Sequence, residues 1–244
     1  MKTAEKYFIM IKAHWVNLSF ILSIVLLCLL YRKQFLNAFN LYKWRKKLKI
    51  KTHQKTFDVL YKNVNGFALS KSARQNNDSI ELLYGEINFE SFIALLSCCN
   101  INDQTRFYDL GSGTGKAVIA TALVYPIKKA VGIERLETLY NCANQLKQKL
   151  IRETRDDSFA QRIEFIYSDF FQCDLGKADL VFINATAFIG DAWTKVANHL
   201  QQLKKNSQCI SISKKLPAKE FKLELETRVE MSWGIAFAYI HRKR

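Results

Sequence analysis

DLGSGTGK, residues 109–116, is the stretch of sequence that decides the fold. It ends the short apolar run 106–111, which predicts a strand, and it leads into the alanine-rich run 116–125, which predicts a helix. Glycines in such a turn let the backbone approach a ligand closely at the N-terminus of the helix. The stretch therefore predicts an α/β domain with a ligand site beyond the end of its first strand.

Three kinds of ligand compete for this loop. A dinucleotide loop needs the pattern GxGxxG, but Lys116 stands where the third glycine should be. A nucleoside-triphosphate loop needs a glycine at its first position, where this chain has Leu110. The GxGxG spacing after an acid fits S-adenosylmethionine best, because Asp109 can face the ammonium group of that cofactor; a glycine-rich turn without a ligand is the alternative. The candidate cofactor-binding residues of the loop are Asp109, Gly111, Gly113, Gly115 and Lys116.

The chain beyond this loop alternates between short apolar runs and helical patterns. Strands are expected at 106–111, 129–134, 163–170, 178–185 and 209–213. Helices are expected between them, at 116–125, 136–154 and 190–205. Two further strands, 223–231 and 235–241, follow without a helix between them and predict an antiparallel pair. The pattern predicts a doubly wound α/β fold whose mostly parallel seven-stranded sheet ends in an antiparallel hairpin.

Acidic and aromatic residues stand at the carboxyl ends of the second and third strands. Ligands of α/β sheets bind at these ends. Glu134 can accept hydrogen bonds from both hydroxyls of a ribose, and a solvated charge is the alternative. Asp169 can accept from the amino group of adenine while Phe170 packs on its ring. These three residues extend the predicted cofactor site.

The fourth strand runs into FINATAF, residues 182–188. Asn184 lies at its carboxyl end, where its amide can accept from or orient an amine that receives a methyl group. Phe182 and Phe188 can form the walls of a narrow apolar channel, although core packing is an equal alternative for Phe182. This part of the sequence predicts where chemistry takes place.

Residues 15–31, WVNLSFILSIVLLCLLY, form an uncharged apolar run near the lower length limit for a bilayer-spanning helix. Trp15 and Tyr31 bracket the run, as interfacial aromatic residues often do. Basic residues are denser after the run than before it, so we expect a single-pass anchor in membrane lipid with the following domain in the cytoplasm. An interfacial or buried helix is the alternative.

The net charge of +15 lies mostly in the N-terminal part of the chain. Residues 1–60 hold 12 Lys and Arg against two Asp and Glu, a net +10, and the other 184 residues hold only +5. A core that binds nucleic acid along one face is usually more basic than this. The basic stretch 43–51 can lie on anionic lipid headgroups, and contact with nucleic acid or an acidic protein is the alternative.

Six short motifs occur in an order that resembles one known family. They are YGE (84–86), FYDLGSGTGK (107–116), GIE (132–134), SDF (168–170), FINATAF (182–188) and SW (232–233). Across residues 80–241 they resemble the disruptor-of-telomeric-silencing (DOT-one-like) family of non-SET histone-lysine methyltransferases, within the class I S-adenosylmethionine-dependent methyltransferases. YGE before the first strand and N-x-x-x-F after the fourth are the discriminating parts, because all S-adenosylmethionine enzymes of this fold share the glycine loop.

The resemblance implies roles for residues at matching positions. Tyr84 and Glu86 would lie in a loop that folds over the methionine end of the cofactor. Asn184 and Phe188 would line a channel for the substrate lysine, and Tyr239 approximately matches a channel tyrosine. The residues implied to bind the cofactor are Asp109, Gly111, Gly113, Glu134, Asp169 and Phe170. The chain departs from the family at Ile87, Ala185 and the short basic tail 241–244, and these departures bear on the nucleosome as a substrate more than on lysine methylation.

The implied activity is methylation of a protein lysine, as by histone H3 core lysine methyltransferases. We expect in-line displacement of the methyl group by a neutral amine, which an apolar channel favours. One alternative is a membrane-anchored methyltransferase that acts on a membrane-associated protein or a small molecule, and another is a non-catalytic module that binds S-adenosylmethionine. A histone target would fit a spanning segment if the protein were secreted into a host. The expected organisation is a membrane anchor in 1–33, a basic helical connector in 34–80 and a methyltransferase domain in 81–244.

Overall fold

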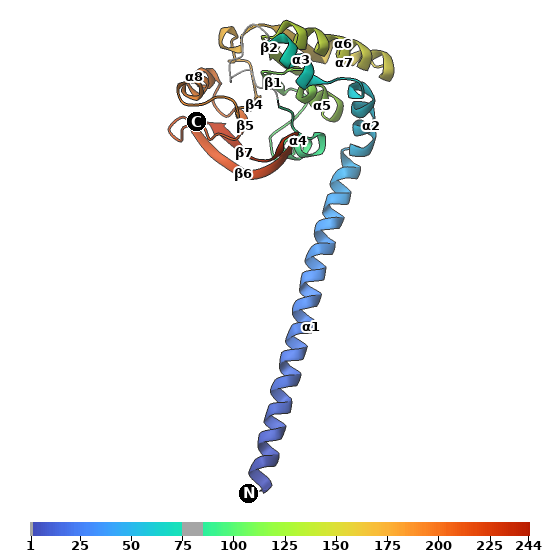
Figure 1. The fold of residues 1–244 in the computed structure, drawn as a ribbon, viewed down its shortest axis with the longest axis vertical. Helices are drawn as coiled ribbons and strands as arrows, with labels where there is room; N and C mark the ends of the chain where they lie inside the picture. The colour runs from blue at the N-terminus through green and yellow to red at the C-terminus, as the bar shows by residue number, and fades with distance from the viewer. Residues whose placement is uncertain (1, 75–84) are drawn as a thin grey trace. The chain divides into compact units, whose positions relative to one another are not determined.

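The computed structural model describes residues 2–74 and 85–244, with side chains described for 20–27 and from 31 onward (Figure 1). The chain forms two compact units, Met1–Ile50 and Lys51–Arg244. The second unit contains the sheet and is the part that matters for the site. The predicted site residue Tyr84 lies outside the described residues.

The second unit is built on a seven-stranded sheet with the strand order β3-β2-β1-β4-β5-β7-β6. Its strands are β1 (Arg106–Leu110), β2 (Lys129–Glu134), β3 (Ile163–Tyr167), β4 (Leu180–Asn184), β5 (Gln208–Ile212), β6 (Phe221–Met231) and β7 (Gly234–Lys243). The first five strands pair in parallel, β7 pairs antiparallel with β5, and β6 pairs antiparallel with β7. The predicted mostly parallel sheet with a terminal antiparallel hairpin is confirmed.

Helices cover both faces of the sheet. The helices of the second unit are α2 (Ile50–Tyr61), α3 (Gly66–Ala73), α4 (Phe89–Leu96), α5 (Lys116–Val124), α6 (Glu137–Thr154), α7 (Ser158–Arg162) and α8 (Asp191–His199). On one face, the Phe92 ring of α4 packs edge-on against Phe107 and Phe182, with ring centroids 6.1 and 5.0 Å apart. On the other face, Val196 of α8 shares a buried cluster with Tyr108 of β1, which points to the opposite side from its neighbour Phe107. The predicted doubly wound arrangement is therefore confirmed.

Two predicted boundaries were wrong. The third strand was expected to run to Phe170, but β3 ends at Tyr167. The side chain of Asp169 accepts a hydrogen bond from the backbone N–H of Phe171 and caps a short 3-10 helix, Phe170–Gln172, which turns the chain out of the sheet. The helix expected over 190–205 ends at His199 and continues only as a single 3-10 turn, Leu200–Gln202.

The first unit consists of the helix α1 (Lys2–Lys47), a single long helix in Figure 1. Within its stretch from Phe20 to Lys47, the most apolar 18-residue window has a mean hydropathy of 1.5, and none of that window is buried. Among the described residues it is the one helix long and apolar enough to cross a membrane by length and composition. The helix ends in the basic residues Arg45, Lys46 and Lys47. Helicity across the expected anchor is confirmed, while its place in a membrane stays a prediction.

Candidate functional site

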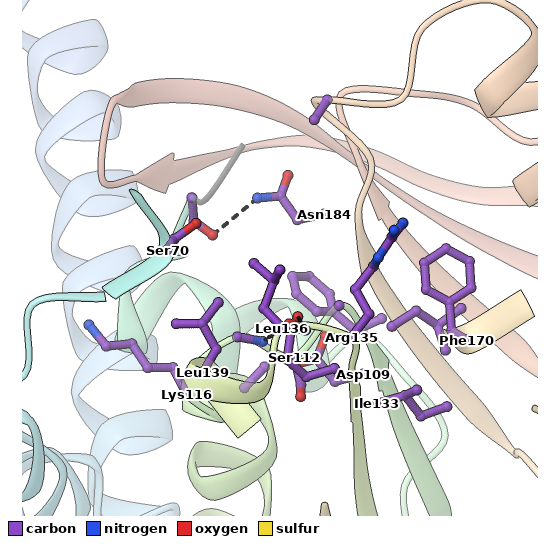
Figure 2. A pocket seen from close by; sticks show the side chains of 18 of the residues that line it. Ser70, Asp109, Ser112, Lys116, Ile133, Arg135, Leu136, Leu139, Phe170 and Asn184 are labelled. Carbon is purple, nitrogen blue, oxygen red and sulfur yellow. Dashed lines mark hydrogen bonds between the residues drawn. The ribbon is translucent and has the colours of Figure 1, made fainter. Parts of the chain in front are cut away.

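A pocket lies beyond the carboxyl ends of β1, β2 and β4, at the edge of the sheet where the sequence placed the ligand (Figure 2). Ten predicted site residues line it: Glu86, Asp109, Gly111, Gly113, Lys116, Glu134, Asp169, Phe170, Asn184 and Phe188. Two others, Gly115 and Tyr239, are not among the lining residues. The fold thus brings together residues that are spread over about one hundred positions of the chain.

The glycine loop passes from β1 into α5 through three left-handed residues. Gly111, Gly113 and Gly115 have φ angles of +78°, +55° and +81°, which side chains other than glycine rarely adopt. Gly111 and Gly113 line the pocket, whereas Gly115 is the N-cap residue of α5 and is not among the lining residues. A Cβ atom on Gly115 would lie 2.5 Å from the ring of Phe165. Gly115 is therefore required for packing and helix capping rather than for contact with a ligand.

Asp109 is the most strongly perturbed acid of the site. Its residue is only 3 % exposed, and burial raises the pKa of its carboxyl well above the usual range, with a further rise from the charge of Glu134. Among the described residues no hydrogen bond to this carboxylate is present. A buried acid without a partner at the wall of a pocket is a ready site for a cationic ligand group, which would favour the ionised form.

Glu134 is buried at the end of β2 and is held by the backbone. Its Oε2 accepts from the N–H of Gly113 at 2.8 Å, and its Oε1 accepts from the N–H of Leu136 at 2.8 Å. Burial raises the pKa of Glu134, and these backbone donors act in the opposite direction. The backbone of Gly113, Leu136 and Arg135 donates to this carboxylate, which offers about four lone-pair sites, so it can still accept a hydrogen bond from a hydroxyl.

Asp169 and Phe170 line the pocket, and Phe170 lies on the side away from Ser70 and Lys116 (Figure 2). Asp169 is engaged through Oδ1 with the backbone of Phe171, while its Oδ2 lies 3.9 Å from a guanidinium nitrogen of Arg135. Phe170 packs against the ring of Phe188 at a centroid distance of 6.0 Å. An acid beside a fixed aromatic surface is suited to a flat, amino-bearing ring.

The side chains of Glu86 and Lys116 form an ion pair with a 2.5 Å separation at the wall of the pocket. The ammonium of Lys116 also lies 5.1 Å from the ring centroid of Tyr61 on α2. The hydroxyl of Tyr61 donates to the carbonyl of Thr114 in the glycine loop. Lys116 therefore fastens the YGE segment to the start of α5, in addition to lining the pocket.

Gly85 and Glu86 of the YGE motif lie against the SW motif. Glu86 donates its backbone N–H to Ser232 Oγ at 3.2 Å, and Ser232 donates its own N–H to the carbonyl of Glu86 at 2.8 Å. A Cβ atom on Gly85 would lie 1.9 Å from the Trp233 ring, so only glycine fits beneath this ring. Asn184 reaches the same point, because its Nδ2 donates to the carbonyl of Gly85 at 3.2 Å.

The channel residues are only partly brought together. Phe182, Phe188 and Asn184 line the pocket, and Phe182 also packs in the core against Phe92. The core packing of Phe182 is confirmed, and its role in a channel stays a prediction. Tyr239 lies inside the sheet on β7, paired with Ser211 of β5, and the ammonium of a neighbouring lysine lies 5.2 Å from its ring centroid. Its buried place in the sheet explains why Tyr239 does not line the pocket.

Two buried hydroxyls of the pocket were not singled out by the sequence. Ser70 on α3 is fully buried, and Ser112 lies in the glycine loop. Neither Oγ atom has a hydrogen-bond partner within residues 2–74 and 85–244. The sequence placed Ser70 in the connector, because nothing in its local pattern shows that α3 packs against α6. Unpartnered buried hydroxyls at a pocket wall are candidates for contact with a ligand.

Comparisons with known proteins agree with the fold and the motifs. Residues 69–236 match the family described as histone methylation protein DOT1. The chain is 32% identical over 139 residues to a Caenorhabditis elegans protein named histone-lysine N-methyltransferase, H3 lysine-79 specific, and 26% identical over 138 residues to one of the same name from Kluyveromyces lactis. These matches cover 54% and 53% of this chain but only 15% and 24% of the two relatives.

A solved structure supports the fold independently. Magnesium protoporphyrin IX methyltransferase from Synechocystis PCC 6803, determined with bound SAM, aligns with a TM-score of 0.50 and 14% identity. The alignment covers 75% of this chain and 94% of that one. The sheet is therefore that of a class I methyltransferase. Because the family match spans more than half of the sequence and contains most of the pocket, the chain belongs to the DOT1 histone methylation protein family.

Proposed function

We propose that this protein is an S-adenosylmethionine-dependent protein-lysine N-methyltransferase. The observation that carries the proposal is the buried carboxyl of Asp109, which has no hydrogen-bond partner among the residues described and shares one pocket with the acids at the ends of β2 and β3. The order of these acids along the sheet edge matches the order of charged, hydroxyl and amino groups along S-adenosylmethionine.

The residues present fit this cofactor at each of its parts. Asp109 would hold the ammonium group, and Gly111 and Gly113 would let the backbone lie close to it. Glu134 would accept from the ribose hydroxyls, because its carboxylate keeps lone-pair capacity beyond its backbone donors. Asp169 and Phe170 would hold the amino group and the face of adenine. When bound, the cofactor supplies a methyl group on a sulfonium centre.

The methyl acceptor would enter beside the carboxyl end of β4, where Phe182, Phe188 and Asn184 line the pocket. A lysine amine has an unperturbed pKa of about 10.4, so it must lose a proton before it can act as a nucleophile. Phe182 and Phe188 form an apolar surround that disfavours the ammonium form and lowers the pKa of the amine. The chain's contribution is therefore to orient the amine and to exclude water.

The family relatives that carry the histone name suggest a histone-like lysine as substrate. The exposed apolar helix α1 favours a second candidate, a lysine in a membrane-associated protein. For this case we propose the organisation expected from the sequence, with a membrane anchor in 1–33, a basic connector in 34–80 and a methyltransferase domain in 81–244. The basic residues after the apolar run would keep the domain on the cytoplasmic side.

A direct test is to incubate the full chain in detergent micelles with methyl-labelled S-adenosylmethionine and either nucleosomes or solubilised membrane protein. Label in lysines of histone bands supports the first substrate, and label in lysines of a membrane protein supports the second. The matched control is Asp109→Asn, which should transfer no label to either. Absence of label with both substrates, despite cofactor binding, would contradict the enzymatic proposal and favour a non-catalytic binding module.

A further inference from the structure

The side-chain amide of Asn184 is fixed in one orientation by its neighbours. Its Oδ1 accepts from the hydroxyl of Thr186 at 2.9 Å and from the backbone N–H of Thr186 at 3.4 Å. Its Nδ2 donates to the carbonyl of Gly85 at 3.2 Å. A flipped amide would place two donors against each other at Thr186 and two oxygens against each other at Gly85, so the network allows one orientation.

The hydroxyl network behind Asn184 has a definite direction. The single proton of the Thr186 hydroxyl is used toward Asn184, so in the 2.9 Å contact between Thr186 and Ser213 the serine must be the donor. Ser213 stands in a left-handed conformation, with φ +69°, and its N–H donates to the carbonyl of Phe237 on β7. Hydrogen bonds that follow one another in this way polarise and strengthen each other.

These bonds leave Asn184 little capacity to accept from an amine. A carbonyl oxygen has two lone pairs, and the Oδ1 of Asn184 already accepts hydrogen bonds from both the hydroxyl and the backbone N–H of Thr186. The amide nitrogen is directed at Gly85, the residue that precedes Glu86 in the wall of the pocket. The hydrogen bonds of Asn184 thus point to Gly85 rather than to a substrate.

We propose that Asn184 holds Gly85–Glu86 in the wall of the pocket through its hydrogen bond to the Gly85 carbonyl, a contact that we call the latch. Thr186 and Ser213 are positioning residues that keep the Asn184 amide in the orientation that this contact needs. The proposal depends on the proposed function only for the identity of the ligand that binds beneath Gly85–Glu86. In this proposal Asn184 holds Gly85–Glu86 in place, instead of contacting the acceptor amine as expected from the sequence. Release of the latch loosens the segment and weakens the closure of the pocket.

The test measures binding of S-adenosylhomocysteine to the full chain in detergent by isothermal titration calorimetry. This probe lacks the sulfonium charge, which a new carboxylate would attract. Asn184→Asp sets an oxygen against the Gly85 carbonyl and should weaken binding roughly tenfold. Asn198→Asp makes the same exchange at an exposed position of α8 and should leave binding unchanged. Thr186→Val should weaken binding roughly threefold, while Thr186→Ser, which restores the hydroxyl, should bind like the wild type.

Hydrogen exchange of residues 86–88 reports the latch without a ligand. Asn184→Asp and Thr186→Val should accelerate exchange there, and Thr186→Ser should not. If these variants lose turnover while binding and hydrogen exchange stay unchanged, the latch proposal is wrong and Asn184 acts on the acceptor amine. If the wild type fails to bind S-adenosylhomocysteine, the proposed function fails, and the exchange measurement still decides the latch. Should Asn184→Asp not fold, the pair of Thr186 variants carries the same test.

Discussion

The two halves of the pocket are built in different ways. The half around Asp109 and Glu134 comes from two adjacent strands and the loops that follow them, within residues 109–136. The half around Gly85 joins side chains and backbone that are 99 positions apart at Asn184 and 146 positions apart at Ser232. One half is therefore a local property of the β-α-β unit, while the other exists only when the whole sheet has formed.

The largest expected effect falls on the local half. Asp109→Asn removes the buried charge that faces the ligand and should weaken binding of S-adenosylmethionine about a hundredfold, since hydrogen bonds to charged groups are strong. The same variant should raise the unfolding midpoint of the cofactor-free protein, because an unpaired buried acid is costly. Calorimetric titration measures the cofactor affinity, and thermal unfolding measures the unfolding midpoint. A fall in the midpoint together with the fall in affinity would show that Asp109 is structural.

The pH dependence of stability follows from the same carboxyl. The folded-state pKa of Asp109 is raised above its unfolded value, so the unfolded chain ionises first as the pH rises from about 4. The free energy of unfolding of the cofactor-free protein should therefore fall with rising pH until the folded-state pKa is passed. Asp109→Asn should flatten this dependence, and a wild-type stability that rises across the same range would contradict the assignment.

Glu134→Gln should have the next largest effect, and again on the local half. The amide cannot accept at both positions, so it loses either a backbone contact to Gly113 or Leu136 or a hydroxyl of the ligand. We expect cofactor affinity to fall about thirtyfold while turnover at saturating cofactor changes little. Steady-state kinetics at varied cofactor concentrations separate the two quantities. A loss confined to turnover would remove Glu134 from the ribose site.

The assembled half should respond to Gly85→Ala. The added Cβ would collide with the ring of Trp233, so we expect a destabilisation of about 1–3 kcal/mol and roughly tenfold weaker cofactor binding. The double variant Gly85→Ala with Trp233→Ala removes the collision and should recover part of the affinity. Equal losses in the single and double variants would show that the Gly85 carbonyl, rather than its fit beneath the ring, limits binding.

The contrast between the halves explains what the sequence could predict. Glycine spacing and the distance from Asp109 to Glu134 report a β-α-β unit directly, so the loop, the mostly parallel sheet and most of the residues that line the pocket could be predicted. The motifs of the other half were visible in the sequence, but their contact through Gly85 depends on how β6 and β7 pack. The expected channel role of Tyr239 remains a prediction, since burial within the sheet separates it from the lining of the pocket.

Ser70 belongs to neither half and gives the smallest expected effect. Its hydroxyl is buried in α3 without a partner in the part of the chain that the structure describes, so Ser70→Ala should not lower the stability of the cofactor-free protein. If the hydroxyl meets the methionine end of the cofactor, as its position near Lys116 suggests, affinity should fall about threefold. Ser72→Ala, an exposed change on the same helix, is the matched control. Equal affinities for both variants would show that Ser70 of α3 does not contribute to ligand binding, so that only the two halves of the pocket bind the cofactor.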